Sequence, residues 1–364
     1  MKKFLLLFLY ICLLILVVIG VVDFMTGMNP ISYISHMSES HDSISSLAAC
    51  LNEDILNENE GYVSYYIKGI SDKDLQMINY NLNNINGSIT SIKVFPELFG
   101  IRKIDFEIER SDNSYVIEAY KNNKPIPEDR VQAIRLYHEV RDILDNIIKG
   151  PMTEYEKELR LHDYIINHCE YSFGSEDNDN EYRAYGALVD GKAVCNGYAE
   201  AFSLLLSCAG IENSFVVGTA DNGDSIENHA WNQVKIKGKW YNVDTTWDDP
   251  VGKVNMKIHA YFNVTDEVMA TDHDWDKTSY KKCDDQNWNY YRHEKLFFNN
   301  ENNMLSALSI KARYISHGMI EVAYSDFCFE TENLSEIYNE SGVESISYMT
   351  LDKNGYKILV LVIN

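Results

Sequence analysis

The stretch from residue 195 to residue 247 constrains the fold more than any other part of the chain. It opens with CNGYAEAFSLLLSCAG, which predicts a helix because apolar side chains recur every three or four residues until Gly210. Three strand-like segments follow it: NSFVVGTA, HAWNQVKI and KWYNVDTTW. We therefore expect one helix followed by strands, the last two of which form a hairpin.

The predicted hairpin brings a histidine and an aspartate to one face. A two-residue Lys-Gly turn at 237–238 pairs Ile236 with Lys239 and sets the register of both strands. Because strand side chains alternate between faces, this register makes His229 and Asp244 diagonal neighbours, about 7–8 Å apart along the backbone. A three-residue loop would instead place them on opposite faces unless a bulge intervened.

Cys195 stands at the start of the predicted helix, where a thiol has a physical route to reactivity. Unpaired N–H groups and the helix dipole favour an anion there, so they stabilise the thiolate, which is the nucleophilic form. The N–H groups of residues 195 and 196 would suit an oxyanion, and Gly197 leaves room for a substrate backbone. The alternative is that Cys195 is a small buried apolar residue, as most free cysteines are.

His229 and Asp244 are the two further groups that a nucleophilic cysteine needs. Asp244 would fix the tautomer of His229, which would take the proton from Cys195 and return it to the leaving group. Taken singly, His229 could equally be a strand-end histidine with one hydrogen bond, and Asp244 a turn carboxylate. Their order and spacing after a helix-start cysteine favour a Cys-His-Asp triad.

Three segments carry a resemblance to a known family: AVCNGYAEAFSLLLSCAGI, NHAWNQVKIKGKWYNVDTTWDDP and HAYFNVTDEVMATDHDW. Across roughly residues 125–275 the chain resembles the bacterial transglutaminase-like superfamily. The resemblance implies a papain-like α+β fold with Cys195 as nucleophile, His229 as general base and Asp244 as the residue that orients it. Ala193 stands where many members have glycine. Members cross-link, cleave peptides or amides, or lack activity, so the resemblance leaves the acyl acceptor open.

Two further residues are expected near the triad. Asn196 follows the cysteine and Trp231 shares the face of His229, so we expect both in the substrate cleft. The segment TDHDWD (271–276) has alternate carboxylates like a hard-cation loop but lacks the glycine turn and the terminal glutamate, so we interpret it as a solvated loop. No CxxC pair occurs in the sequence. We therefore expect neither a metal nor a cofactor.

The N-terminus carries the clearest local signal. MKKFLLLFLYICLLILVVIGVVDF places two lysines before an uncharged run from Phe4 to Val22, which as a helix would be about 28 Å long. That length approaches the roughly 30 Å of a bilayer core and exceeds most signal-peptide cores, so we interpret residues 1–28 as an uncleaved anchor rather than a cleaved signal. The positive-inside rule then predicts a single-pass protein of the cell membrane, with the bulk of the chain extracellular.

Charge and cysteine content exclude several classes of protein. The formal net charge of −23 argues against nucleic-acid binding, because phosphates repel an acidic surface. Six cysteines outside the predicted anchor are too few for a disulfide scaffold, and their pairing cannot be deduced. The apolar fraction of 45% is enough for a sizeable core.

We divide the chain into five parts: an anchor at 1–28, a polar stalk at 29–61, a small α+β region at 62–124, the catalytic domain at 125–280 and a β-rich region at 281–364. Within the small α+β region, ITSIKVF, IRKIDFEIER and SYVIEAY are typical of strands, and DKDLQMINYNLNNI is typical of a helix. Apolar residues recur at helical spacing from Val131 through Ile147, and Gly150-Pro151 closes the predicted helix. Thr153 and Glu156 predict a capping box at the start of the next helix.

The leading functional hypothesis is a membrane-tethered extracellular cysteine enzyme that acts on protein or cell-wall peptide amides. Water as acceptor would make it a protease or amidase, and a primary amine would make it a transglutaminase. Hydrolysis is slightly favoured because no second site for an amine is visible. One alternative is a catalytically silent cell-surface binding module that keeps the fold. Another alternative is an assembly or stalk protein whose function depends on its terminal strand regions.

Overall fold

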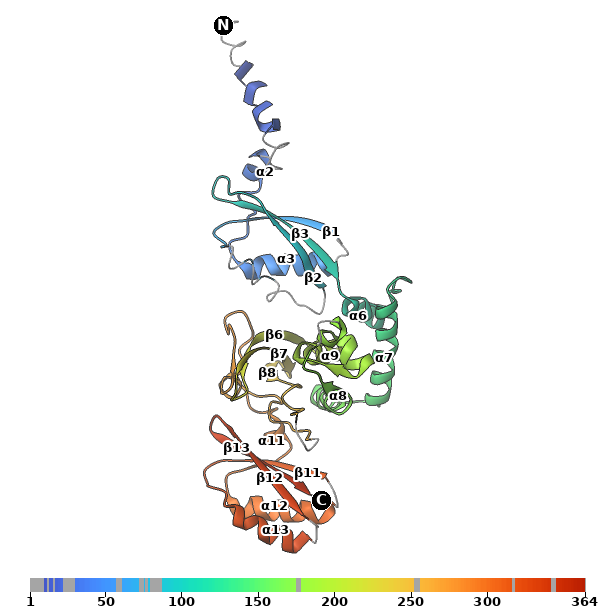
Figure 1. Ribbon diagram of the computed structural model, residues 1–364, viewed down its shortest axis with the longest axis vertical. Coiled ribbons are helices and arrows are strands. Elements are labelled where there is room, and N and C mark those ends of the chain that lie inside the picture. Colours follow the sequence, from blue (N-terminus) through green and yellow to red (C-terminus); the bar gives the residue numbers. More distant parts are fainter. Residues whose placement is uncertain are drawn as a thin grey trace. The chain divides into compact units, whose positions relative to one another are not determined.

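In the computed structural model the chain divides into two compact units, Met1–Tyr115 and Val116–Asn364, and the division falls within helix α6 (Asp112–Asn122) (Figure 1). The structure describes residues 10–11, 13–15, 17–21, 30–56, 61–71, 75, 78, 87–174, 178–251, 256–315, 318–341 and 345–363. This division differs from the predicted domain boundaries, because residues 281–364 belong to the same unit as the predicted catalytic domain.

The first unit is built on a three-stranded antiparallel sheet in the order β1-β3-β2. Its elements are α2 (Pro30–Ser35), α3 (Ile44–Leu56), β1 (Gly61–Ile67), β2 (Gly87–Val94) and β3 (Arg102–Arg110). Ile104, Phe106 and Ile108 alternate along β3 and are buried on one face of the sheet, where they share a core with α3.

Helix α3 lies within the segment predicted as a polar stalk, 29–61. Apolar residues recur every four positions in this segment, so one face of the helix is apolar and packs on the sheet. The buried residues on that face are Leu47, Leu51 and Ile55. The polar positions between them face outward, so the segment forms an amphipathic helix.

Helix α6 is a correction, since SYVIEAY (114–120) was expected to be a strand. Val116 and Ala119 are buried and lie three residues apart, which is a helical spacing. Burial of that helical face outweighs the strand propensity of the tyrosines and valine. The helix expected at 72–85 lies outside the described residues, apart from Leu75 and Ile78.

The expected membrane-spanning segment at 1–28 is not borne out. Within the part of the chain that the structure describes, every helix is too short or too polar to cross a bilayer. This finding corrects the prediction of a single-pass membrane localisation. Of the predicted segment, residues 1–9, 12, 16 and 22–28 lie outside the described residues.

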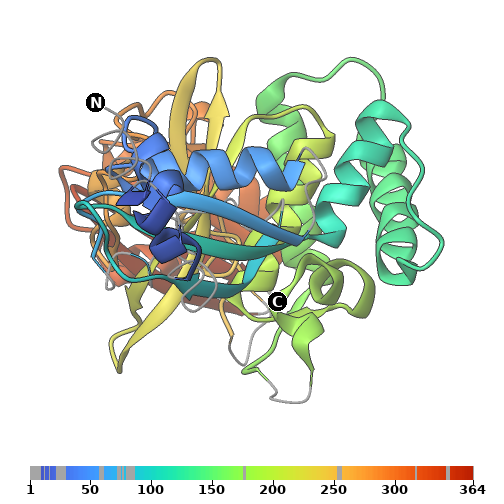
Figure 2. The ribbon, with the colours of Figure 1, turned by 90° about the horizontal axis from the view of Figure 1, so that it is seen from above.

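Three helices precede the central sheet of the second unit. They are α7 (Val131–Ile147), α8 (Glu154–His168) and α9 (Cys195–Cys208). Helix α7 lies where a helix was predicted and ends at Ile147, just before Gly150. The predicted capping box of α8 is confirmed, because the Thr153 hydroxyl accepts from the Glu156 N–H at 3.2 Å while the Glu156 carboxylate accepts from the Thr153 N–H at 2.7 Å. Figures 1 and 2 both place α9 between the strands and α7.

The central sheet has the order β8-β7-β6-β9 and positions most of the candidate site. Its strands are β6 (Asn213–Asp221), β7 (Ile226–Ile236), β8 (Lys239–Val243) and β9 (His273–Asp274). Lys237 and Gly238 both have positive φ, 50° and 81°, as a type I′ turn requires. Ile236 pairs with Lys239, so the predicted hairpin register is confirmed. The return strand ends at Val243, earlier than expected.

Short elements connect these parts. Between α8 and α9 lie β4 (Glu170–Tyr171), the 3₁₀ turn η1 (Asp179–Tyr182), the π-helical turn η2 (Gly186–Asp190) and β5 (Lys192–Ala193). After the hairpin come α10 (Asp266–Met269) and α11 (Tyr290–His293).

The C-terminal part, predicted as a β-rich region at 281–364, holds a four-stranded sheet together with helices. Its elements are β10 (Phe297–Phe298), α12 (Glu301–Tyr314), β11 (Gly318–Tyr324), η3 (Thr331–Asn333), α13 (Leu334–Ser341), β12 (Ile346–Lys353) and β13 (Tyr356–Ile363), with strand order β10-β11-β13-β12. Helices α12 and α13 cover one face of the sheet (Figure 1). The other face packs into the core that holds Trp231 and Tyr261.

Candidate active site

Cys195 is the first residue of α9. The preceding residue, Val194, is extended and forms no side-chain cap, so its side chain leaves the first-turn N–H groups of the helix uncapped. The thiol is half-buried and is not in a disulfide, like the other described cysteines. This location matches the expected position at a helix start.

Gly197 has a different role from the one expected. A Cβ built at this position would lie 2.6 Å from the Glu181 carbonyl oxygen, 3.0 Å from the Arg183 carbonyl oxygen and 2.7 Å from the Ala193 side chain. The glycine therefore makes room for the chain's own segment around η1, not for a substrate backbone. Close packing of this segment fixes where α9 begins and thus where Cys195 lies.

His229 and Asp244 meet across the end of the hairpin. His229 lies on β7, and Asp244 directly follows the last residue of β8. The His229 Nε2 lies 2.8 Å from Asp244 Oδ2, and both side chains are buried. The histidine also interacts with the Cys195 thiol. Because Asp244 occupies Nε2, Nδ1 is the nitrogen left for the thiol.

The electrostatics of this pair favour an imidazolium beside a carboxylate. Burial alone would lower the pKa of His229, but the charge and hydrogen bond of Asp244, together with the contact to Cys195, raise it to about 10. For Asp244, burial would raise the pKa, yet His229 and His273 hold it well below its ordinary value. Asp244 is therefore ionised at neutral pH.

His273 is a site residue that the sequence interpretation missed. It pairs through β9 with β6, is buried, and lies with its Nε2 3.1 Å from Asp244 Oδ2. The interpretation of 271–276 as a solvated loop is therefore wrong for His273 and for the buried Trp275. A signal was present, because His273 and Trp275 repeat the His-x-Trp spacing of His229 and Trp231.

The two residues expected in the cleft have other contacts. The Asn196 amide donates to the Tyr182 carbonyl at 2.6 Å and to the Glu200 carboxylate at 3.3 Å, so it ties the helix start to η1. Trp231 is wholly buried, and its ring packs edge-on against Trp275. A fully buried indole does not line an open cleft, which corrects that prediction.

Tyr171 is another residue near the thiol that sequence reasoning did not single out. It lies on β4 and interacts electrostatically with Cys195. Burial, together with the negative charges of Cys195, Glu227 and Asp244, raises its pKa to about 12, so its hydroxyl keeps its proton at neutral pH.

Two groups among the described residues have the donor atoms for a metal ion. The first comprises His229, Asp244 and His273, whose ligand atoms lie within 4.8 Å of one another. These atoms are already engaged in the hydrogen bonds of the candidate triad. A cation could bind there only by displacing the contacts that orient His229.

The second group comprises His162, Asp163 and His259. His162 Nδ1 and His259 Nε2 lie 3.2 and 2.9 Å from Asp163 Oδ1. Their other nitrogens contact Asp248 at 3.0 Å and Glu321 at 2.5 Å. Each ring nitrogen therefore already has a carboxylate partner. Hydrogen bonds between these side chains account for the cluster without a metal ion.

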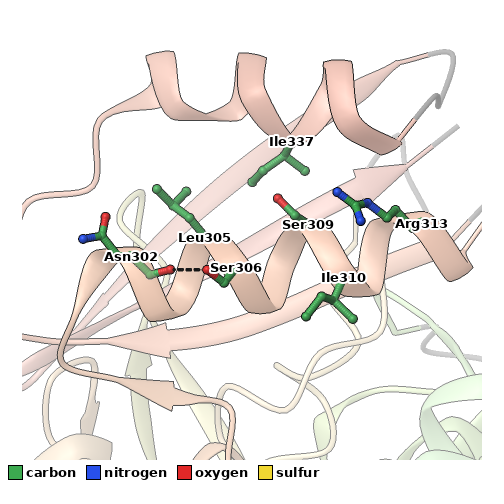
Figure 3. Close-up of a pocket in the computed structure, with 7 residues that line it drawn as sticks. All are labelled: Asn302, Leu305, Ser306, Ser309, Ile310, Arg313 and Ile337. Atoms are coloured by element: carbon green, nitrogen blue, oxygen red, sulfur yellow. Dashed lines mark hydrogen bonds between the residues drawn. The ribbon is translucent and has the colours of Figure 1, made fainter.

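A groove of about 320 Å³ between α12 and α13 has no part in this chemistry. Figure 3 shows the residues that line it, among them Leu305, Arg313 and Ile337. Its lining has no cysteine, histidine or carboxylate side chain. We assign no catalytic role to this groove.

Comparison with known proteins defines the class. Residues 141–245, which include Cys195, His229 and Asp244, match the family model described as the Transglutaminase-like superfamily. The chain therefore contains a transglutaminase-like domain on a mixed α/β core, as the sequence resemblance implied. Members of that superfamily are cysteine proteases, amidases and transamidases.

Individual relatives are distant. Kyphoscoliosis peptidase of Homo sapiens is 22% identical over 246 residues, which cover 60% of this chain and 36% of that protein. Peptide-N(4)-(N-acetyl-beta-glucosaminyl)asparagine amidase of Caenorhabditis briggsae is 34% identical over 113 residues, covering 29% of this chain and 17% of that protein. A solved structure of a TGase superposes with a TM-score of 0.28 and 16% identity over 61% of this chain and 58% of that chain. This chain spans well under two thirds of the length of these curated relatives.

Proposed function

We propose that this protein is a cysteine-dependent enzyme that hydrolyses amide bonds in peptides or proteins. In this proposal Cys195 is the nucleophile, His229 the general base and acid, and Asp244 the residue that orients His229. The observation that carries it is the single imidazole that contacts both the thiol and a buried carboxylate, at 2.8 Å from the latter. A structural histidine needs only one such partner.

Acylation follows from this geometry. The Cys195 thiolate attacks the carbonyl carbon of the amide, and a new C–S bond forms as the oxygen takes up negative charge. The N–H groups at the start of α9 are suited to stabilise this oxyanion. The His229 imidazolium then gives its proton to the amide nitrogen, the C–N bond breaks, and the amine leaves.

Deacylation reverses the roles of the same groups. Neutral His229 takes a proton from water while the water oxygen attacks the thioester carbonyl. Collapse of the second tetrahedral intermediate breaks the C–S bond, regenerates the thiolate and releases the carboxylic acid. Asp244 stabilises the imidazolium at each stage. The two curated relatives are named as a peptidase and an amidase, which supports water as the acceptor.

Mass spectrometry of reaction products tests the proposal. The full chain is incubated with a mixture of peptides that carry main-chain, glutamine and asparagine amides, in the presence and absence of a primary amine. We expect cleavage or deamidation that Cys195→Ala abolishes. Cys328→Ala is the matched control, because Cys328 is an exposed cysteine outside the site, and it should leave the rate unchanged.

The products separate the possible outcomes. Conjugation of the amine instead of hydrolysis would identify a transamidase and refute water as the acceptor. An acyl-enzyme at Cys195 that forms and hydrolyses would support the mechanism directly. Complete absence of turnover, with no covalent adduct at Cys195 for any amide in the mixture, would contradict the enzyme proposal.

A further inference from the structure

We propose that Lys353 of the C-terminal sheet is a positioning residue of the active site and acts through Asp272 and His273 on Asp244. The inference rests on the proposed function. It means that the region after residue 281 contributes a residue to the active site. It predicts that this region sets the electrostatics of Cys195 rather than serving only as an attached domain.

The first link is the contact between His273 and Asp244. Asp244 Oδ1 accepts from the backbone N–H groups of Thr246 at 2.9 Å and Trp247 at 3.2 Å. Its Oδ2 faces the Nε2 atoms of His229 at 2.8 Å and His273 at 3.1 Å. All four of its acceptor positions are thus filled, and His273 holds the oxygen that orients His229.

The second link joins His273 to Lys353 through Asp272. His273 Nδ1 lies 2.7 Å from Asp272 Oδ1, so the ring bridges two carboxylates. Asp272 Oδ2 accepts from the Tyr261 hydroxyl at 2.6 Å and lies 3.4 Å from Lys353 Nζ. The ammonium also lies over the Tyr261 ring, 3.3 Å from its centroid, where a cation is attracted to the ring face.

Lys353 occupies an unusual place for a lysine. Its side chain is 2% exposed, although a buried ammonium is costly unless it is paired. Burial lowers the pKa of Lys353 from its ordinary value, while Asp272, Asp248 and Asp244 oppose that shift. A lysine kept in such a place, with three carboxylates in its field, points to an electrostatic role.

These groups form a row in which acidic and basic side chains alternate. In order they are Cys195, His229, Asp244, His273, Asp272 and Lys353. Each of the two carboxylates, Asp244 and Asp272, therefore lies between two basic groups, and the row is neutral when all its members are ionised. Other titratable groups facing the row are Tyr171, Asp248 and Tyr261, and Glu227 and Tyr182 in turn face Tyr171.

The C-terminal sheet is held firmly enough to fix Lys353. Ala323, Ile358 and Val360 of this sheet are buried in one core with Trp231 and Tyr261. Glu321 of β11 also accepts from the Tyr291 hydroxyl at 2.7 Å and contacts His259. Two charged residues of the sheet, Glu321 and Lys353, thus contact side chains that precede the sheet in the chain.

The test is the rate of Cys195 alkylation by iodoacetamide against pH in the full chain. Replacing Lys353 with methionine removes the positive charge at the end of the row opposite Cys195, so the midpoint of the rate should rise by roughly half a pH unit. Replacing Asp272 with asparagine removes a negative charge and should lower the midpoint. Opposite shifts distinguish electrostatics from loosened packing, which would move both variants the same way.

The chain offers a matched control. Lys357→Met removes a lysine from the adjacent strand of the same hairpin, where it pairs with Asp352 at 3.0 Å and is half exposed. This variant should keep the wild-type dependence of the alkylation rate on pH. Lys353→Arg keeps the positive charge, so its midpoint should lie close to that of the wild type. Circular dichroism checks that each variant folds. If Lys353→Met does not fold, the inference is tested by whether Asp272→Asn lowers the midpoint.

The outcomes are distinguishable from failure of the proposed function. If wild-type Cys195 shows no midpoint below that of the exposed Cys328, the triad itself is refuted. A low wild-type midpoint that neither Lys353→Met nor Asp272→Asn shifts would overturn this inference while leaving the triad intact.

Discussion

Replacing Asp244 with asparagine should nearly abolish activity, because all four neighbours of this carboxylate are donors. The backbone N–H groups of Thr246 and Trp247 face one oxygen, and His229 and His273 face the other. An asparagine has one acceptor oxygen and one NH2 group. In either amide orientation, two donors lose their acceptor and face another donor instead.

The magnitude follows from these contacts. Loss of two charge-assisted hydrogen bonds at about 1.5–3 kcal/mol each corresponds to roughly 3–6 kcal/mol, some of which local rearrangement would recover. For catalysis the tautomer matters more, since His229 would turn its protonated nitrogen toward the thiol and could not take up a proton there. Loss of the orienting carboxylate in comparable triads lowers kcat on the order of 10⁴-fold.

Steady-state kinetics and denaturant unfolding of Asp244→Asn test this reasoning. The matched control is Asp274→Asn, an exposed aspartate on β9, which should change neither quantity measurably. A folded Asp244→Asn protein whose kcat stays within tenfold of wild type would refute the assigned role.

The contribution of Asp244 to the free energy of unfolding should depend on pH in one direction. Since the folded pKa of Asp244 lies below its ordinary value, its stabilisation is present above about pH 4 and is lost as the pH falls.

Two further predictions concern stability. Gly197→Ala should destabilise the fold by about 1–3 kcal/mol, because its Cβ would lie 2.6 Å from the Glu181 carbonyl oxygen, and urea unfolding measures this. Unchanged stability would contradict the packing role of this glycine. Glu158 is buried, and burial raises its pKa to about 8 although Asn263 donates to it. The wild-type protein should therefore lose stability as the pH rises from about 4.5 to 8, whereas Glu158→Gln should not, and parallel pH profiles of the two melting temperatures would contradict this.

Local patterns in the sequence determined much of the site. The Lys-Gly turn fixes the hairpin register, and that register brings His229 and Asp244 close together at the end of the paired strands. Apolar spacing likewise gave α7 and α9. These features were predictable because they depend on residues close together in the chain.

The missed features depend on distant partners. His273 joins the site through pairing of β9 with β6, across more than fifty residues of sequence, and no local pattern specifies that pairing. The hairpin alone would leave Trp231 facing an open cleft. In the structure Trp275, which is distant in sequence, packs against it. Helices α12 and α13 and the ion pair of Lys353 depend on the same kind of long-range packing.

The most direct test of the central claim is the alkylation rate of Cys195 against pH, compared with a His229→Ala variant. Cys328 in the same chain serves as an internal reference for an exposed thiol. The triad predicts that Cys195 reacts well below the ordinary thiol midpoint of about pH 8.5, and that His229→Ala shifts it to that value. Equal profiles for Cys195 and Cys328, unchanged in the variant, would show that His229 does not activate the thiol and would contradict the proposed chemistry.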